Sequence, residues 1–442
     1  MALGGVRMTD SNGNIGTEST NLAEKVCGLL FDISGQNKIW TEGVGATLAD
    51  KFKDTVVEFN NLDEVKAAGI TAYTGETDSS GVSQDFMLGI PYYHIEHFFQ
   101  INGGSGRLFV AFADCKNDWN AIVNMQKEAD GEISQFGVWT EQNLWRETDK
   151  DAESYAVDIV QDLQLVAKTL ANEYFAPAHI LLCANTAKIK KADGTDDKVV
   201  FSKIPSCVMD CRYVSVLLSQ GIDTDVRAMH LALDSATPIG TVGAALGVLA
   251  SSNVAESIGY VMNHEMQAYF PDIEFGFGDV TKTGDAYTNT TRYSSLTSTQ
   301  LDHLDDLGYV FLCKYTGLPG KVYFSGDQSC SKDDYRTISR NRVINKSRRL
   351  VRTVLLPYVN SPIKVDPTTG TLSAAQITVF TNKITDVLNA MVSAEEISGI
   401  GQVNIPASQN ILKNDKLMIS YTLVPVGTSK LIDVTEGFVL HA

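Results

Sequence analysis

The stretch that decides the fold starts at Leu307-Gly308-Tyr309, continues through Gly317-Leu318-Pro319-Gly320 and ends at Val322-Tyr323-Phe324. The glycines and the proline in its middle predict a turn between two short apolar strands, which is the pattern of a β-hairpin. An arginine-rich helix follows, and Pro357 ends it because proline cannot continue a helix. A turn over residues 366–370, a second helix and a strand-rich tail complete the chain. Nothing in this order is typical of an active site.

The arginine-rich helix separates into two faces when residues are placed at 100° intervals from residue 341. Its apolar side is formed by Val343, Ile344, Leu350, Val351, Val354 and Leu355, and its basic side by Arg342, Lys346, Arg348, Arg349 and Arg352. The apolar side must pack on a core. A basic helix face is most often only a solvated surface, but five positive charges on one arc are notable in a chain of net charge −17. We therefore predict an exposed binding face.

The end of the chain has the period of a β-strand. A second helix, with an apolar stripe from Ile377 to Met391, is core-facing. After it, apolar residues alternate with polar ones over residues 417–423 and again at Ile432, Val434, Phe438 and Leu440. A hairpin folded on its own domain would explain the first of these strands. For the last one, the pattern favours donation to the sheet edge of a neighbouring subunit, because unpaired edges accept added strands.

Composition limits the function classes. A chain of 442 residues with 44% hydrophobic and 20% charged residues can form two or three soluble domains. The net charge of −17 argues against nucleic acid or an anionic membrane surface as the main partner. The most apolar run, over residues 239–250, is shorter than the roughly 20 residues that span a bilayer, and its glycines and alanines predict a closely packed helix. The start of the chain lacks the apolar core of a signal peptide. The seven scattered cysteines indicate reduced thiols.

Strand and helix patterns alternate in the first two thirds of the chain. Short apolar runs predict strands at 26–31, 55–59, 108–112, 133–139 and 180–183, and apolar spacing predicts helices at 118–128 and 152–174. We predict an α/β fold, α+β overall, with a mixed sheet covered by helices. The predicted divisions are a flexible arm at 1–20, an N-terminal part at 21–98 packing with the C-terminal domain, an outer α/β domain at 99–290 and a C-terminal domain at 291–442.

Candidate chemistry is sparse. His94-Ile95-Glu96-His97 does not have the His-Glu-x-x-His spacing that lets two histidines share a zinc ion on one helix face. The glycine-rich loop around Gly103 lacks the Lys-Ser/Thr ending of a P-loop and precedes a strand rather than following one. We therefore predict no catalytic residue, no metal ligand and no cofactor. An enzyme that depends on a metal or on phosphate, using these residues, stays open as an alternative.

Residues 230–442 resemble the contractile tail sheath proteins of phages and of related injection systems. The resemblance is carried by the Pro/Gly/Ala-rich segment Thr237 to Gly247, by Leu307-Gly308-Tyr309-Val310 with its hairpin, by the arginine-rich helix and by Val403-Asn404-Ile405-Pro406. It implies an outward α/β domain, a C-terminal α+β sheath domain on the inner wall, and extended terminal arms that join neighbours. It also implies that the basic helix touches an acidic tail tube.

What the resemblance implies about function is mechanical. The chain is expected to polymerise as a helical sheath around an inner tail tube and to contract, driving the tube through a target envelope. Its expected partners are other copies of itself, the tube protein, and baseplate and tail-terminator proteins, without direct nucleic-acid binding or membrane insertion. The expected place is a virion tail or a phage-tail-like particle, assembled in the bacterial cytoplasm. A tube or terminator protein is the structural alternative.

Overall fold

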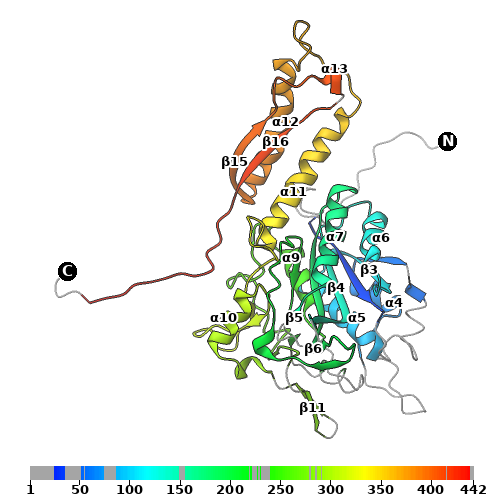
Figure 1. Cartoon of the computed structure of the whole chain (residues 1–442), viewed down its shortest axis with the longest axis vertical. Helices are drawn as coiled ribbons and strands as arrows, with labels where there is room; N and C mark the ends of the chain where they lie inside the picture. Colours follow the sequence, from blue (N-terminus) through cyan, green and yellow to red (C-terminus); the bar gives the residue numbers. More distant parts are fainter. Residues whose placement is uncertain are drawn as a thin grey trace, which may run out of the picture.

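The computed structural model describes residues 24–34, 51–53, 55–73, 86–148, 155–218, 239–277, 291–414 and 416–438, with a few shorter pieces between 220 and 289. Figure 1 shows a body built around a β-sheet, a projection that rises from it, and a C-terminal segment that leaves both. We call residues 338–425 the projection and residues 426–438 the C-terminal segment. Among the described residues, no helix is both long and apolar enough to cross a membrane.

The body is organised by one mixed sheet with strand order β2-β3-β1-β4-β6-β7, to which β5 and β8 add. The central strands run parallel to one another: β1 (Val26–Asp32), β3 (Arg107–Ala113), β4 (Gln135–Glu147), β6 (His179–Lys190) and β8 (Val214–Val216). Antiparallel strands lie at its margins: β2 (Val56–Phe59), β5 (Tyr155–Ala156) and β7 (Asp196–Lys198). The predicted α/β fold with a mixed sheet is confirmed.

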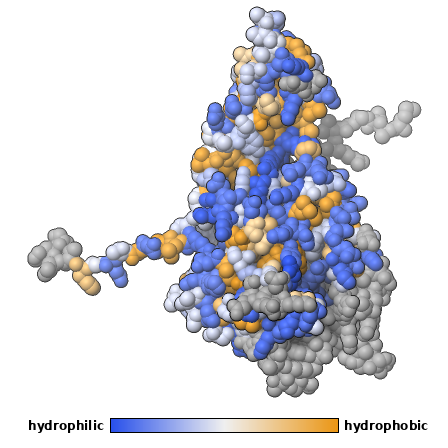
Figure 2. All heavy atoms as spheres, viewed as in Figure 1, coloured by the Kyte–Doolittle hydropathy of each residue, from blue (hydrophilic) through white to orange (hydrophobic). Residues whose placement is uncertain are grey.

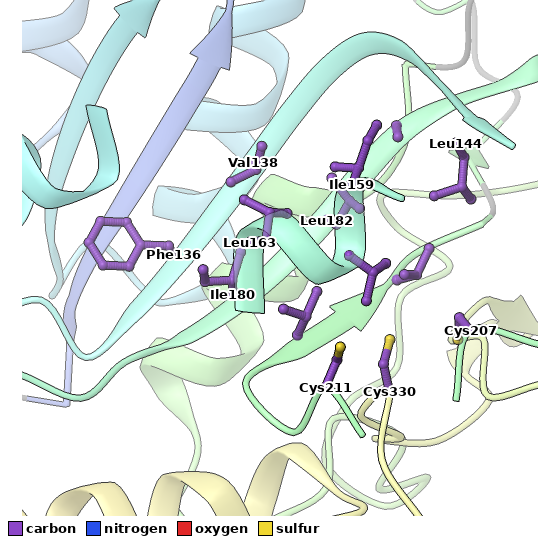
Figure 3. Packing of buried hydrophobic residues seen from close by; sticks show 14 of the residues in the cluster. Phe136, Val138, Leu144, Ile159, Leu163, Ile180, Leu182, Cys207, Cys211 and Cys330 are labelled. Atoms are coloured by element: carbon purple, nitrogen blue, oxygen red, sulfur yellow. The ribbon is translucent and has the colours of Figure 1, made fainter. Parts of the chain in front are cut away.

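Helices cover both faces of this sheet. The central strands carry apolar side chains on both sides, so both faces must be buried. Helices α6 (Asn120–Glu128) and α7 (Ile159–Asn172) cover one face, and α5 (Phe86–Ile101) and α9 (Val242–Ser251) cover the other. In Figure 3, Phe136 and Val138 of β4 and Ile180 and Leu182 of β6 pack beside Leu163 of α7. The alternate residues of the same strands point into the second core.

Helix α9 is the closely packed helix that its glycines and alanines predict. It is buried along its length, and it lies against α5 and the sheet. At Gly243 a side chain would overlap the backbone of His94, so only glycine permits this approach of the two helices.

Asp32 ties three strands together at the carboxyl edge of the sheet. Its buried carboxylate accepts hydrogen bonds from the backbone N–H of Ser34 and Cys115 and from the side chains of Ser34, Thr140 and Gln142. Ser34 and Cys115 follow β1 and β3, and Thr140 and Gln142 lie within β4 where its register with β6 is irregular, so one side chain links all three strands.

The remaining elements follow in chain order. In the body they are α4 (Leu62–Ala67), η1 (Phe201–Lys203), β9 (Gln220–Gly221), β10 (Ile273–Glu274), β11 (Val280–Thr283), β12 (Ala286–Asn289), η2 (Tyr293–Ser295), α10 (Ser298–Asp306), β13 (Leu312–Cys313) and β14 (Tyr323–Phe324). The projection contains α11 (Ile338–Leu355), η3 (Leu356–Tyr358), α12 (Ala374–Ser393), β15 (Ile397–Asn404), α13 (Ile411–Asn414) and β16 (Ser420–Pro425). The predicted hairpin is confirmed, since β13 and β14 pair antiparallel.

Two predicted divisions of the chain are wrong. Residues 21–98 do not form a separate part of the chain, because β1 lies in the middle of the body sheet between β3 and β4. Residues 291–337 also belong to the body, since Leu304, Tyr309 and Tyr323 lie in the core beneath that sheet. The physical reason is burial: the fully apolar strand Val26–Asp32 needs cover on both faces, which only a central position gives. The predicted arm at 1–20 lies outside the described residues.

The projection is fastened to the body by Arg342, a buried arginine in the first half of α11. Its guanidinium donates hydrogen bonds to the backbone carbonyls of Leu249 (2.6 Å), Ser252 (3.3 Å) and Asn253 (3.1 Å), at the carboxyl end of α9. The last carbonyls of a helix have no partner within it and carry a partial negative charge, so a cation is favourable there. Arg342 therefore caps α9 and sets where α11 crosses the body.

Two ion pairs strengthen the same joint. Lys346 pairs with Glu396, which lies just before β15, and both side chains are at most 5% exposed. Arg349 pairs with Glu24 at the start of the described chain and also donates to the carbonyl of Pro177 (2.9 Å). Burial raises the pKa of the Glu396 carboxyl, and Lys346 opposes that shift. Arg342, Lys346 and Arg349 are thus each matched by a partner within the chain.

We predict that Arg342→Met lowers the free energy of unfolding by about 3 kcal/mol, because it leaves three backbone carbonyls at the end of α9 without their charged hydrogen-bond donor. Arg352→Met is the matched control, since it removes the same charge from the same helix at an exposed position and should cost about 1 kcal/mol or less. Urea unfolding followed by circular dichroism measures both. Equal losses for the two variants would contradict the role of Arg342 as a cap.

Candidate assembly surfaces

The five α11 residues predicted to form a basic face do not form one exposed arc, and the prediction of such an arc is wrong for Arg342 and Lys346. Arg342 is 2% exposed and Lys346 is 4% exposed, and both are held within the chain. Arg349 is half-buried and paired with Glu24. A helical wheel gives the angles between side chains, but it does not show that the body and Glu396 cover this side of α11. Contact between these three residues and a tube is therefore not supported.

Arg348 and Arg352 differ from the other three, because they lie at a groove. Arg348 donates to the hydroxyl of Tyr213 (2.8 Å), and the guanidinium of Arg352 stacks over the ring of Phe175, 4.2 Å from its centroid. Within the described part of the chain, neither has a carboxylate within ion-pair distance. The groove has a volume of about 460 Å³ and separates the end of α7 from the second half of α11.

Strands β15 and β16 form a separate two-stranded sheet in the projection. They pair antiparallel, from Ile397 with Pro425 to Asn404 with Ser420. The inner face, which includes Ile400, Tyr421 and Leu423, packs with α11 and α12. No further described strand pairs with either outer edge, so each edge presents backbone N–H and C=O groups that can bind an added strand.

The C-terminal segment does not fold back on its own domain. It leaves the end of β16 and extends away from the body in Figure 1. Ile432 is 77% exposed, Val434 82% and Phe438 fully exposed, whereas Leu440 lies outside the described residues. Figure 2 shows hydrophobic and hydrophilic residues along this segment with no cover from the described chain. A row of exposed apolar side chains of this kind marks an interaction site.

The histidine motif is part of the body core. His94 is fully buried, its Nε2 lies 2.9 Å from the carbonyl oxygen of Ile239, and burial lowers its pKa to about 3. His97 packs edge-on against Tyr93, and burial lowers its pKa to about 4. A search of the described ranges finds no group of three or more His, Cys, Asp or Glu side chains that could hold a metal ion. These residues stabilise the contact of α5 with α9.

The glycine-rich loop uses its backbone donors internally. The side-chain oxygen of Asn102 accepts hydrogen bonds from the N–H groups of Gly104 (2.8 Å) and Ser105 (3.2 Å). A phosphate cradle needs such N–H groups free to point at the ligand. The loop is a turn closed by Asn102, which follows α5 and leads into β3.

Sequence reasoning missed the groove and the partners of the basic helix. Glu24 and Glu396 lie far from α11 in sequence, and neither stands in a motif. Phe175 adopts φ +55°, a backbone conformation that favours glycine, and it is still 51% exposed. In the sequence, the one sign of the groove was that an aromatic residue, Phe175, directly follows the helix predicted at 152–174.

Comparison with known proteins adds a family and a fold. The DUF2586 N-terminal domain model matches residues 88–328, and the DUF2586 C-terminal domain model matches residues 334–442. The boundary between them falls just before α11, where the body ends and the projection begins. No curated protein matches the sequence.

Similar solved structures come from contractile injection systems. A chain of the anti-feeding prophage (AFP) baseplate is 13% identical with a TM-score of 0.55, and the match covers 100% of both chains. A chain of the PVC sheath complex of an extracellular contractile injection system, in the contracted state, is 10% identical with a TM-score of 0.52, covering 100% of this chain and 98% of that one. A chain of the AFP helical sheath in the contracted state is 12% identical with a TM-score of 0.50, and the match covers 99% of both chains. The chain therefore belongs to the DUF2586 family and has the fold found in the sheaths of contractile injection systems.

Proposed function

We propose that the chain is a structural subunit of a contractile sheath, which polymerises as a helical tube around an inner tube and contracts to drive that tube through a target envelope. The observation that carries the proposal is the exposed, alternating C-terminal segment on a chain whose whole length matches sheath-complex chains. The proposed role is mechanical rather than catalytic. Its proposed place is the tail of a phage or phage-tail-like particle.

Charge distribution supports head-to-tail assembly. Residues 334–442 contain twelve Lys and Arg and eight Asp and Glu, a net charge of +4. Since the whole chain carries −17, residues 1–333 carry −21. A subunit with ends of opposite charge is attracted to the opposite end of the next copy, and such contacts need not close into a ring. This polarity favours a helical polymer over a symmetric dimer.

The proposed joint between subunits is strand donation. The C-terminal segment, with Ile432, Val434 and Phe438 on one face, adds to an open edge of the two-stranded sheet of a neighbour. An added strand is held by backbone hydrogen bonds along its length. It can therefore keep two subunits linked while their bodies change orientation.

The inner tube and the baseplate are the other proposed partners. Among the five α11 residues predicted to form the basic face, Arg348 and Arg352 have room for a contact outside the chain, since the other three are paired within it. The match to an AFP baseplate chain favours a second candidate, a sheath-like subunit that forms a closed ring at the baseplate. The two candidates differ in whether the polymer grows.

We expect purified full-length protein to form striated tubes of variable length in negative-stain electron microscopy, with a hollow core wide enough for an inner tube. Head-to-tail contacts that do not close give this growth. Tube length should rise with protein concentration. Rings of fixed subunit number at every concentration would replace the sheath proposal by the baseplate candidate, and monomers alone would contradict both.

Deletion of residues 432–442 should abolish tubes and leave the monomer folded. The described residues of this stretch are exposed in the isolated chain, so their loss removes no core contact. The expected result is an unchanged circular-dichroism spectrum and melting temperature, with a single monomer peak in sedimentation velocity at concentrations where the full chain polymerises. Full-length tubes from the truncated chain would rule out donation of this strand, and an unfolded truncated chain would show that the segment stabilises its own domain.

A further inference from the structure

A row of polar side chains lies beneath α11 at the edge of the body core. Cys27, Gln135 and His179 are neighbours in register at the starts of β1, β4 and β6. Register neighbours on parallel strands point to the same side of a sheet, and here that side is the one covered by α5 and α9. Gln135 and His179 are fully buried. An amide and an imidazole therefore lie in the core on the side of the sheet where α9 packs.

Helix α11 carries further polar groups over this row. Arg342, Asn345 and Arg349 are spaced by three and four residues, so they share one face of the helix. Both ends of this face contact the body: Arg342 donates to the last carbonyls of α9, and Arg349 donates to the carbonyl of Pro177, two residues before His179. Asn345 lies between them and is 1% exposed. Its amide is therefore enclosed between α11 and the start of β6.

The side chains of Gln135, His179, Arg342 and Asn345, which we call the joint cluster, have unpartnered polar atoms. Both amide atoms of Gln135, both of Asn345, Nε of Arg342 and Nδ1 of His179 are buried and make no hydrogen bond within the described chain. Folded proteins rarely leave such atoms unsatisfied, because each has lost its hydrogen bonds to bulk water. The joint cluster therefore requires a further hydrogen-bonding partner.

His179 defines what that partner must do. The hydroxyl of Ser215 donates its one hydrogen to the carbonyl of Gln328 (2.7 Å), so Nε2 of His179 must donate to the Ser215 oxygen, 2.9 Å away. Burial lowers the pKa of His179 to about 3, and the charge of Arg342 acts in the same direction, so the ring is neutral. Nδ1 of His179 is thus an acceptor that needs a donor, whereas Nε–H of Arg342 needs an acceptor.

Water satisfies both requirements, because one molecule donates and accepts hydrogen bonds. A halide ion has no hydrogen to donate to Nδ1 of His179. A metal cation cannot accept from Arg342, and it would lie in a joint that already holds three basic side chains against the two carboxylates of Glu24 and Glu396. Buried water typically makes about three hydrogen bonds to polar groups that have no other partner. The donors and acceptors of the joint cluster fit this pattern.

A second groove connects this region with the surface. It has a volume of about 470 Å³, and its lining includes Glu24, Lys346 and Arg349. Lys346 directly follows Asn345 in the sequence, and Arg349 lies one helical turn beyond it. The groove therefore extends from solvent to the helix face that carries Asn345, which gives water a route of exchange with the joint.

We propose that the joint between body and projection is an internal water site, in which ordered water bridges Gln135 and His179 of the sheet to Arg342 and Asn345 of α11. The water completes the hydrogen bonds of the cation that fixes the projection. The site belongs to the single chain, so the inference does not depend on the proposed sheath function. Body and projection are then joined by a hydrated network of charges and amides.

Comparison of three glutamines tests whether the joint is hydrated. In the full-length chain, Gln135→Met should lower the melting temperature on the order of 2 °C, because the bridging water and Asn345 lose a partner. In a dry joint the same change removes an unsatisfied amide and should raise the melting temperature, which would overturn the inference. Gln126→Met should lower it, since Gln126 has protein partners, and Gln100→Met, at an exposed position, should leave it unchanged. Calorimetry of dilute protein measures all three variants.

A crystal structure of the full-length chain at a resolution that shows ordered water identifies the occupant. Density should lie within about 2.7–3.2 Å of Nδ1 of His179 and of Nε of Arg342. An anomalous peak at this position after a bromide soak would show an anion and overturn the inference. Direct hydrogen bonds of His179 and Arg342 to the amides of Gln135 and Asn345, with no density between them, would also overturn it. Neither outcome alters whether the chain forms tubes, so a failure here is distinct from a failure of the proposed sheath function.

Discussion

The position of the projection depends on one buried cation. Arg342 satisfies the carboxyl end of α9, and α9 is itself locked against α5 and the sheet by glycines that leave no room for side chains. A buried guanidinium without partners would be strongly unfavourable, so α11 has one place where it can cross the body. The packing of α12, β15 and β16 on α11 then follows. The positions of the groove and of β16, from which the C-terminal segment starts, therefore also depend on the contact of Arg342 with α9.

Local pattern was sufficient for the central strands and for several of the long helices. The spacing of apolar residues predicted α6, α11, α12 and the strands β1, β2, β3, β4 and β6 of the body, because each buries a face with its own period. It failed at the start of α7, where the predicted helix at 152–174 begins only at Ile159 after the short strand β5. The spacing of apolar residues does not predict strand order. Nothing in the sequence of Val26–Asp32 indicates that β3 and β4 lie on either side of this strand. The division of the chain was wrong for that reason.

Sequence patterns also predicted the candidate site only in part, because its residues come from distant parts of the chain. The basic residues of α11 were recognised as unusual, but periodicity treats lysine and arginine as surface residues. Arg342 is buried against the end of α9, and Lys346 is buried in its pair with Glu396. Both partners lie far from these residues in the sequence, so no sequence pattern indicates the contacts. The alternation at Ile432, Val434 and Phe438 is a local signal in the sequence, and the structure leaves these side chains exposed without assigning a strand to them; the donated strand stays a prediction. The groove was not, since it lies between elements about 180 residues apart.

A sheath that contracts must move its subunits without coming apart, which requires contacts of unequal strength. Within the subunit, the joint is made of buried charges, and separating one such pair costs about 3–5 kcal/mol. Between subunits, the proposed contact combines backbone hydrogen bonds with exposed side chains, and an exposed ion pair contributes about 0–1 kcal/mol. In the proposed sheath, we expect the contacts between subunits to change first when the polymer rearranges, while body and projection turn together as one piece. In that proposal the extended segment is a tether that permits rotation, because the described residues beyond Lys430 are exposed and pack on no other described part of their own chain.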